Sequence, residues 1–414
     1  MMRLSKRILS YHINHVDQMP FHLFTKTNAA CSFCEKAKAL LEEHGYQYIE
    51  TSFDTLSEMK THVSAFVDEQ HVNSFPLLVT PEKKVVYGFE QLRDLLEEHV
   101  LRDSRLSAFP IQHDDIYDLY KQHVASFWVS DEIQADDSME FEQLNPGEQR
   151  FVKNVLAFFS QADGLVNENL MTYFMNEVQL QESTLFYSIQ SFMESEHNVT
   201  YSKLLDNLVK DQDEKKACFN AITEIDSVRQ KAQFINKHMN FSERFAHRLI
   251  AFACVENLLF AGSFSCLFWL KQRHPNILAG LYQSNAFISR DEYLHYLHAV
   301  ALYRKLKYKP VVSVVHSIIS EAVDNEIEFI CDSLPSSLVG INGENMAQYI
   351  KFLADKMCGD FDVPPIYGVN ANPLPFMETL GMNSKCNFFE VRPTEYRKAT
   401  PDTCDVDGGD DEDF

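Results

Sequence analysis

Short apolar runs alternate with helix-like stretches over roughly the first quarter of the chain. Runs rich in Phe, Tyr, Val and Leu at residues 21–25, 46–50, 75–79 and 84–87 predict strands. The stretches between them, and the one after the last run, predict helices. Alternating strands and helices between about residues 20 and 99 indicate a small α/β unit.

The pattern changes after Gly147. No proline occurs from there to His274, and the only glycines after Gly147 in this run are Gly164 and Gly262. A run without helix breakers, rich in Leu, Phe, Ala, Glu and Lys, predicts long helices.

One stretch, residues 249–270, is almost continuously apolar and long enough to cross a bilayer. Glu256 near its middle would be costly in lipid, and the sequence holds no second stretch of this kind. A helix that is apolar on all sides also suits the centre of a soluble bundle, and we expect that placement.

A chain of 414 residues exceeds one ordinary hydrophobic core, which favours two domains. The predicted divisions are a first domain at 15–103, a linker at 104–118, a second domain at 119–372 and a C-terminal segment at 373–414. The final stretch, residues 399–414, holds seven acids and no base, which predicts a disordered tail.

Composition narrows the class of partner. The net charge of −23 argues against nucleic acid, whose binders present Lys and Arg. No basic and apolar leader opens the sequence. Nine cysteines form an odd count without a regular framework, which is typical of reduced thiols. We therefore expect a cytoplasmic protein with neither nucleic acid nor membrane as a partner.

The pattern Glu-x-x-His occurs twice, at Glu194/His197 and at Glu292/His295. Each pair is separated by about one helical turn, so its two side chains share one helix face. A single pair is common on solvated helices and carries little weight. Two pairs on separate long helices form a candidate metal site.

Two further carboxylates strengthen this hypothesis. Glu256 stands alone in the apolar helix, and Asp163 lies in the stretch FFSQADGLVNENL. A buried carboxylate is costly unless it is paired or binds a cation. Two such carboxylates and two inward Glu-x-x-His pairs are the donor set of ferritin-like di-metal bundles. Oxygen-rich ligation with two imidazoles suits iron or manganese.

Tyr201 lies seven positions after Glu194 and four after His197, on the same predicted helix face. A phenol one turn beyond a metal-binding imidazole can approach a metal ion without binding it. A redox tyrosine beside a metal site would need an apolar surrounding. Helical spacing directs three apolar side chains toward the same volume: Phe260, Phe264 and Ile288.

These motifs resemble the radical-generating small subunit of class I ribonucleotide reductase, most closely its eukaryotic-type branch. The similarity covers about residues 117–396 through the stretches VLAFFSQADGLVNENL, FMESEHNVTYSKLL, AFACVENLLFAGSFSCLFWLK and ISRDEYLH. The resemblance implies two iron ions, with manganese as the alternative, held by Asp163, Glu194, His197, Glu256, Glu292 and His295. It also implies that Tyr201 is oxidised to a stable tyrosyl radical.

The resemblance further implies a path for the radical out of the subunit. Trp128 matches the family's near-surface tryptophan, and Asp291 matches an aspartate that joins His197 to it. Tyr396, in NFFEVRPTEYRKA, matches the exit tyrosine. The acidic tail ending in Phe414 matches the segment that docks into the large, catalytic subunit. A homodimer is expected from the family.

The stretch CSFC places Cys31 and Cys34 after the first predicted strand, at the start of a helix. A helix N-terminus favours a thiolate, and this context indicates a thioredoxin-like redox site. A zinc site would need a second CxxC, which the sequence lacks. The segment resembles glutaredoxin over about eighty residues. The resemblance implies a cis peptide at Pro76 and glutathione binding by Lys26 and the backbone around Phe75.

Together these features predict an N-terminal α/β thioredoxin-like (glutaredoxin) fold and a C-terminal all-α ferritin-like bundle with a disordered acidic tail. The expected protein is a small subunit of ribonucleoside-diphosphate reductase, which supplies a radical for the reduction of ribonucleotides to deoxyribonucleotides. The fused module would re-reduce the enzyme. The alternatives are a ferritin-like di-metal oxidase and an iron-handling protein with a glutaredoxin module. Neither gives a role to Tyr201, Trp128 or the acidic tail.

Overall fold

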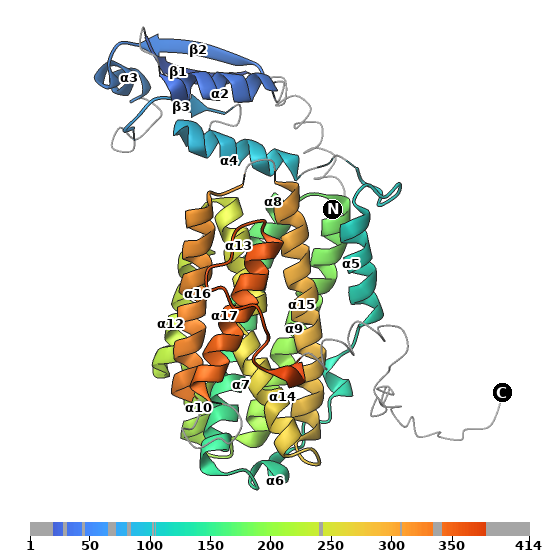
Figure 1. Ribbon diagram of the computed structural model, residues 1–414. Coiled ribbons are helices and arrows are strands. Elements are labelled where there is room, and N and C mark those ends of the chain that lie inside the picture. Colours follow the sequence, from blue (N-terminus) through green and yellow to red (C-terminus); the bar gives the residue numbers. More distant parts are fainter. Residues whose placement is uncertain are drawn as a thin grey trace, which may run out of the picture.

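The computed structural model describes residues 20–377 and shows a small sheet domain at one end of a long helical bundle (Figure 1). The gaps inside this range are residues 28–30, 44–45, 65–71, 81–83, 102, 104, 240–242, 307–308 and 334–341. Tyr396 and the predicted docking tail therefore lie outside the described residues.

The first domain follows the predicted alternation of strands and helices. Its elements are β1 (Phe21–Lys26), α2 (Ser32–Glu43), β2 (Tyr48–Phe53), α3 (Leu56–Val63), β3 (Leu77–Val79), β4 (Val85–Tyr87) and α4 (Gly88–Val100). The strand order is β2-β1-β3-β4, with β1 parallel to β2 and antiparallel to β3, and β3 antiparallel to β4. This mixed sheet confirms the predicted glutaredoxin-like fold. β2 begins two residues later than predicted, because Tyr48 pairs with Phe21.

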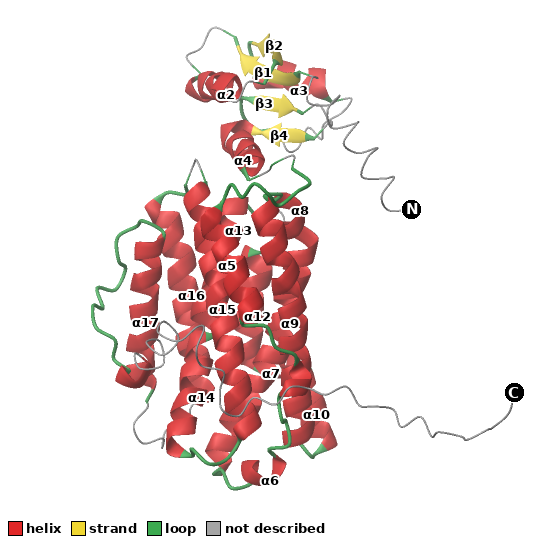
Figure 2. Cartoon of the chain, turned by 90° about the vertical axis from the view of Figure 1, so that its right-hand side faces the viewer, coloured by secondary structure: helices red, strands yellow, loops and turns green. Residues whose placement is uncertain are grey.

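Alternation along β1 sends side chains to both faces of the sheet. Leu23 packs in a cluster with Leu40 of α2 and Leu92 of α4, while Phe24 packs with Met59 of α3. Figure 2 shows α2 and α4 on one side of the sheet and α3 on the other. Helices therefore cover both faces of the sheet.

The second domain is built from long helices. They are α5 (Asp114–Ala125), α7 (Pro146–Asn169), α9 (Gln181–Leu208), α12 (Asp226–His238), α13 (Phe245–Cys254), α14 (Ala261–Arg273), α15 (Ala279–Lys305), α16 (Val312–Ser333) and α17 (Gly343–Asp360). Shorter helical elements connect them: η2 (Ser130–Glu132), α6 (Ser138–Phe141), η3 (Leu170–Phe174), α8 (Met175–Glu177), α10 (Gln212–Phe219) and α11 (Ala221–Glu224). α7 begins where the sequence signals it, with Asn145 as the N-cap and Pro146 in the first turn.

The segment between the domains is attached to the bundle. Leu101 is buried in the bundle core, and its carbonyl oxygen accepts a hydrogen bond from Gln179 N–H (2.9 Å). Arg105 forms ion pairs with Asp103 (2.8 Å) and with Glu182 of α9 (2.7 Å). α5 then begins at residue 114, inside the range predicted as a linker.

The apolar stretch at 249–270 lies in the bundle, as expected. Among the described residues one helix, Phe245–Arg273, is long and apolar enough to cross a membrane, and 89% of its most apolar window is buried inside the protein. It is not regular throughout, because a π-helical turn, η4 (Val255–Leu259), separates α13 from α14. Glu256 lies in that turn.

A buried ion pair fixes the end of this π-helical turn. Lys231 of α12 pairs with Glu326 of α16 (2.6 Å), and both side chains are fully buried. Lys231 Nζ also donates to the carbonyl oxygen of Leu259 (2.6 Å), and Glu326 Oε1 accepts from the N–H of Gly262 (3.0 Å). The pair thus satisfies two backbone groups beside the change from π- to α-helix.

Candidate metal centre

The structure brings all six predicted ligand side chains to one place in the bundle. α7 contributes Asp163, α9 contributes Glu194 and His197, η4 contributes Glu256, and α15 contributes Glu292 and His295. None of the six is more than 3% exposed. They form two groups whose donor atoms lie within 4.8 Å of one another: Asp163, Glu194 and His197, and Glu194, Glu256, Glu292 and His295. Glu194 belongs to both groups.

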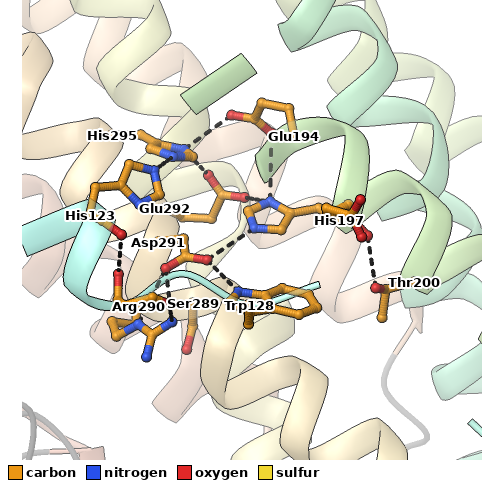
Figure 3. A network of polar contacts seen from close by, with 12 residues as sticks. His123, Trp128, Glu194, His197, Thr200, Ser289, Arg290, Asp291, Glu292 and His295 are labelled. Atoms are coloured by element: carbon orange, nitrogen blue, oxygen red, sulfur yellow. Dashed lines mark hydrogen bonds and ion pairs between the residues drawn. The ribbon is translucent and has the colours of Figure 1, made fainter. Parts of the chain in front are cut away.

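Both imidazoles turn the same nitrogen toward the carboxylates (Figure 3). His197 Nδ1 lies 3.0 Å from Glu292 and 3.7 Å from Glu194. His295 Nδ1 lies 2.8 Å from Glu292 and 3.1 Å from Glu194. Glu194 and Glu292 therefore lie between the two imidazoles, where each could contact two cations.

The chemistry of these donors fits a pair of cations. Neither oxygen of Asp163 and neither oxygen of Glu256 has a hydrogen-bond partner among the described residues. Burial, and then the carboxylates of Glu194 and Glu292, raise the pKa of Asp163 well above its usual range. Burial and Glu292 likewise raise the pKa of Glu256. Two divalent cations would balance the four carboxylates and occupy the unpartnered oxygens.

A chain of hydrogen bonds leads outward from His197. Its Nε2 lies 3.3 Å from Asp291 Oδ2, and the same oxygen accepts from Trp128 Nε1–H at 2.7 Å. Burial would raise the pKa of Asp291, but Arg290 and the hydrogen bond to His197 hold it well below its usual range. The contacts implied for His197, Asp291 and Trp128 are therefore present. Trp128 is only 1% exposed in this chain, so it does not lie at the surface.

Tyr201 lies within aromatic side chains near the carboxylate cluster. Its ring stacks on Phe159 of α7, with ring centroids 4.7 Å apart. Phe159 in turn contacts the rings of Phe260 and Phe264. Tyr201 is 1% exposed, and its hydroxyl has no hydrogen-bond partner among the described residues. Burial, and then Asp163, raise the pKa of Tyr201 well above its usual range, so the phenol keeps its proton.

Two residues of this region were not found from the sequence. Phe159 lies four positions before Asp163, an offset that could have placed it on the same helix face. His123 of α5 contacts His295, with the two Nε2 atoms 2.9 Å apart. No local pattern pointed to His123, because the two histidines lie 172 positions apart in the sequence.

The redox pair of the first domain has the predicted setting. Cys31 and Cys34 form a disulfide at the N-terminus of α2, and the N–H of Cys34 also reaches Cys31 Sγ (3.3 Å). Cys31 is partly exposed, and Cys34 is buried. The peptide bond between Phe75 and Pro76 is cis, as expected, and Lys26 is exposed at the end of β1.

Comparison with known proteins agrees with both halves of this description. The family model for the ribonucleotide reductase small chain matches residues 105–373, and the glutaredoxin model matches residues 22–85. The chain is 44% identical over 307 residues to the ribonucleoside-diphosphate reductase small chain of Nicotiana tabacum, covering 73% of this chain and 92% of that one. Identity to the small subunit of Dictyostelium discoideum is 43% over 310 residues, covering 74% and 91%.

A solved structure shows the same fold. The Rnr4 homodimer of Saccharomyces cerevisiae is 31% identical with a TM-score of 0.61, and the match covers 69% of this chain and 91% of that one. Fold and site thus define a helical oxidoreductase subunit with a carboxylate–histidine centre, preceded by a glutaredoxin module. The chain belongs to the ribonucleotide reductase small-chain family. It is a ribonucleoside-diphosphate reductase small chain with a glutaredoxin domain at its N-terminal side.

Proposed function

We propose that this small chain stores its oxidising equivalent as a radical on Tyr201. The observation that supports the proposal is the setting of the phenol, one turn beyond His197 on α9 and stacked on Phe159. Loss of one electron and the phenolic proton leaves a neutral radical. The surrounding rings of Phe159, Phe260 and Phe264 keep water and reductants away from it.

The metal ions would be held by the six residues of the two donor groups. Asp163, Glu194 and His197 would bind one ion, and Glu194, Glu256, Glu292 and His295 the other. A redox-active metal pair bound by these residues would supply the one-electron oxidation of the nearby Tyr201 phenol, with dioxygen as the oxidant. We infer iron as the native metal, with manganese as the alternative, because both accept mixed oxygen and imidazole ligands.

The route out of the subunit would begin at the hydrogen-bonded residues His197, Asp291 and Trp128. When Trp128 loses an electron, its Nε1 proton can move to Asp291, whose carboxylate is 2.7 Å away. The radical would be passed to the large, catalytic chain, which reduces the ribonucleotide. Tyr396 and the acidic tail, both outside the described residues, are the proposed points of transfer and docking. The small chain would act as a homodimer, the state of the Rnr4 structure.

The glutaredoxin domain would reduce the disulfide that each turnover leaves in the large chain. The Cys31 thiolate attacks one sulfur of that disulfide, and Cys34 then displaces the second product thiol. The partner gains two thiols, and the Cys31–Cys34 disulfide forms. Two molecules of glutathione, bound beside Lys26, Phe75 and Pro76, reduce it again. A cytoplasmic location, where such thiols are kept reduced, is part of the same proposal.

Tyr201→Phe tests the radical assignment. After loading with iron and exposure to oxygen, the variant should bind metal as the wild type does, but lack the tyrosyl signal in its EPR spectrum and nearly all nucleotide reduction. Tyr187→Phe is the matched control, since Tyr187 is also a buried tyrosine of α9 but contacts His298 rather than the carboxylate cluster. A full tyrosyl signal from the Tyr201 variant would refute the assignment.

A further inference from the structure

His123 holds a position next to the centre that the family assignment does not explain. It lies on α5, which contributes none of the six donors, and it is fully buried. Its Nε2 lies 2.9 Å from the Nε2 of His295 (Figure 3). The ring also contacts Phe186, with ring centroids 5.5 Å apart. One imidazole therefore meets the outer nitrogen of another.

The direction of this hydrogen bond follows from the contacts of the other ring nitrogen of His295. Its Nδ1 faces Glu292 and Glu194 at 2.8 and 3.1 Å, the side from which a cation would be bound. An imidazole that gives one nitrogen to a cation carries its proton on the other. His295 Nε2–H must then donate, and His123 Nε2 must accept. His123 keeps its own proton on Nδ1, which has no hydrogen-bond partner among the described residues.

The two candidate metal-binding imidazoles therefore have unlike outer partners. His197 donates to a carboxylate, Asp291, whereas His295 donates to a neutral imidazole. A carboxylate withdraws the proton more strongly and makes the ligating nitrogen more basic than a neutral acceptor does. The ligating nitrogens of His197 and His295 should therefore differ in basicity, although both residues are histidines.

We propose that His123 is a positioning residue for His295: it fixes the ring of His295 and makes the metal position of Glu256, Glu292 and His295 distinct from that of Asp163 and His197. This inference rests on the proposed metal-binding function. Without an acceptor at residue 123, the buried N–H of His295 would be unsatisfied, and the ring could turn away from Glu292 and Glu194. Removing such a partner typically lowers metal affinity about 10- to 100-fold.

The test is a titration of the metal-free, full-length chain with Mn²⁺, in which the EPR signal of free Mn²⁺ reports binding. The wild type should bind two ions per chain. His123→Leu, which has no acceptor, should weaken one of them about 10- to 100-fold and leave the other unchanged. His123→Gln, whose amide oxygen can accept from His295, should recover most of the loss.

His298→Leu is the matched control. His298 is also buried and contacts Phe186, but its Nε2 has a hydrogen-bond contact with Ser183 (3.1 Å) and not with one of the six candidate ligands. Both ions should bind to this variant as to the wild type. Unchanged binding by both His123 variants would overturn the proposal, and so would equal weakening by Leu and Gln in folded protein. A wild type that binds fewer than two ions would instead refute the proposed metal function.

Discussion

Gly262→Ala should destabilise this protein, although helix propensity predicts the opposite. Gly262 lies in α14, directly after the π-helical turn that carries Glu256. Alanine is favoured over glycine in a helix by about 1 kcal/mol, so an exposed helix would gain stability from the change. A Cβ at this position, however, would lie 2.3 Å from Glu326 Oε1 and 2.7 Å from Ile330 Cγ1.

The size of the expected loss of stability follows from the contacts of the Glu326 carboxylate. Its carboxylate pairs with the buried Lys231 and accepts the N–H of Gly262, so it cannot move aside freely. Lys231 Nζ also lies over the rings of Phe158 and Phe329, at 3.7 and 3.9 Å from their centroids. Overpacking costs about 1–3 kcal/mol, and breaking a buried ion pair about 3–5 kcal/mol. We expect a net loss of about 2 kcal/mol or more.

Urea unfolding followed by helical circular dichroism measures the difference, read from the midpoint at constant slope. Gly164→Ala is the matched control: Gly164 lies in the middle of α7, and its added Cβ would meet only Asn198 Nδ2, at 4.0 Å. That variant should gain up to about 1 kcal/mol. A Gly262 variant as stable as the wild type would show that the ion pair does not constrain this turn.

Three further outcomes are expected. Burial raises the pKa of Glu182, but hydrogen bonds from Gln112 and Arg105 outweigh it and lower the pKa from 4.5 to about 2. Glu182→Gln should therefore lower the free energy of unfolding above pH 4.5 by on the order of 1 kcal/mol, since solvent screens the pair with Arg105, and this difference from the wild type should narrow as the pH falls toward 2. Cys31→Ser should leave the radical yield unchanged but slow multiple turnovers with glutathione, and not with dithiothreitol; equal rates with glutathione would contradict self-reduction. Deleting residues 399–414 should leave the radical and abolish competition for the large chain, and a deletion that competes as well as the full chain would contradict docking by the tail.

The candidate metal ligands could be predicted because their signal is local. Glu194 and His197 are one turn apart on a single helix, and so are Glu292 and His295, so spacing alone places each pair on one face. Glu256 was recognisable as a carboxylate in an apolar helix. The architecture followed in the same way, from long runs without helix breakers.

The features that escaped prediction depend on packing between distant segments. His123 reaches His295, and Lys231 reaches Glu326, only after different helices come together. The π-helical turn at Glu256 likewise leaves no periodic trace in the sequence. Residues 101–117, which contain Pro110 and several charges, have the composition of a linker, whereas Leu101 and Arg105 are held by the bundle and α5 begins within this range.

The attachment of Leu101 and Arg105 to the bundle limits how far the glutaredoxin domain can move. Leu101, the first residue after α4, accepts a hydrogen bond from Gln179 of the bundle, and Arg244 of the bundle lies 3.6 Å from Glu90 of α4. The domain that carries Cys31 and Cys34 is thus attached to the bundle directly and not through a long flexible linker. If these thiols serve the large chain, the oxidised cysteines of that chain must come to them. Reduction then depends on how far the cysteine-bearing segment of the large chain can extend toward the glutaredoxin domain. A longer segment before α5 would let the glutaredoxin domain itself move farther.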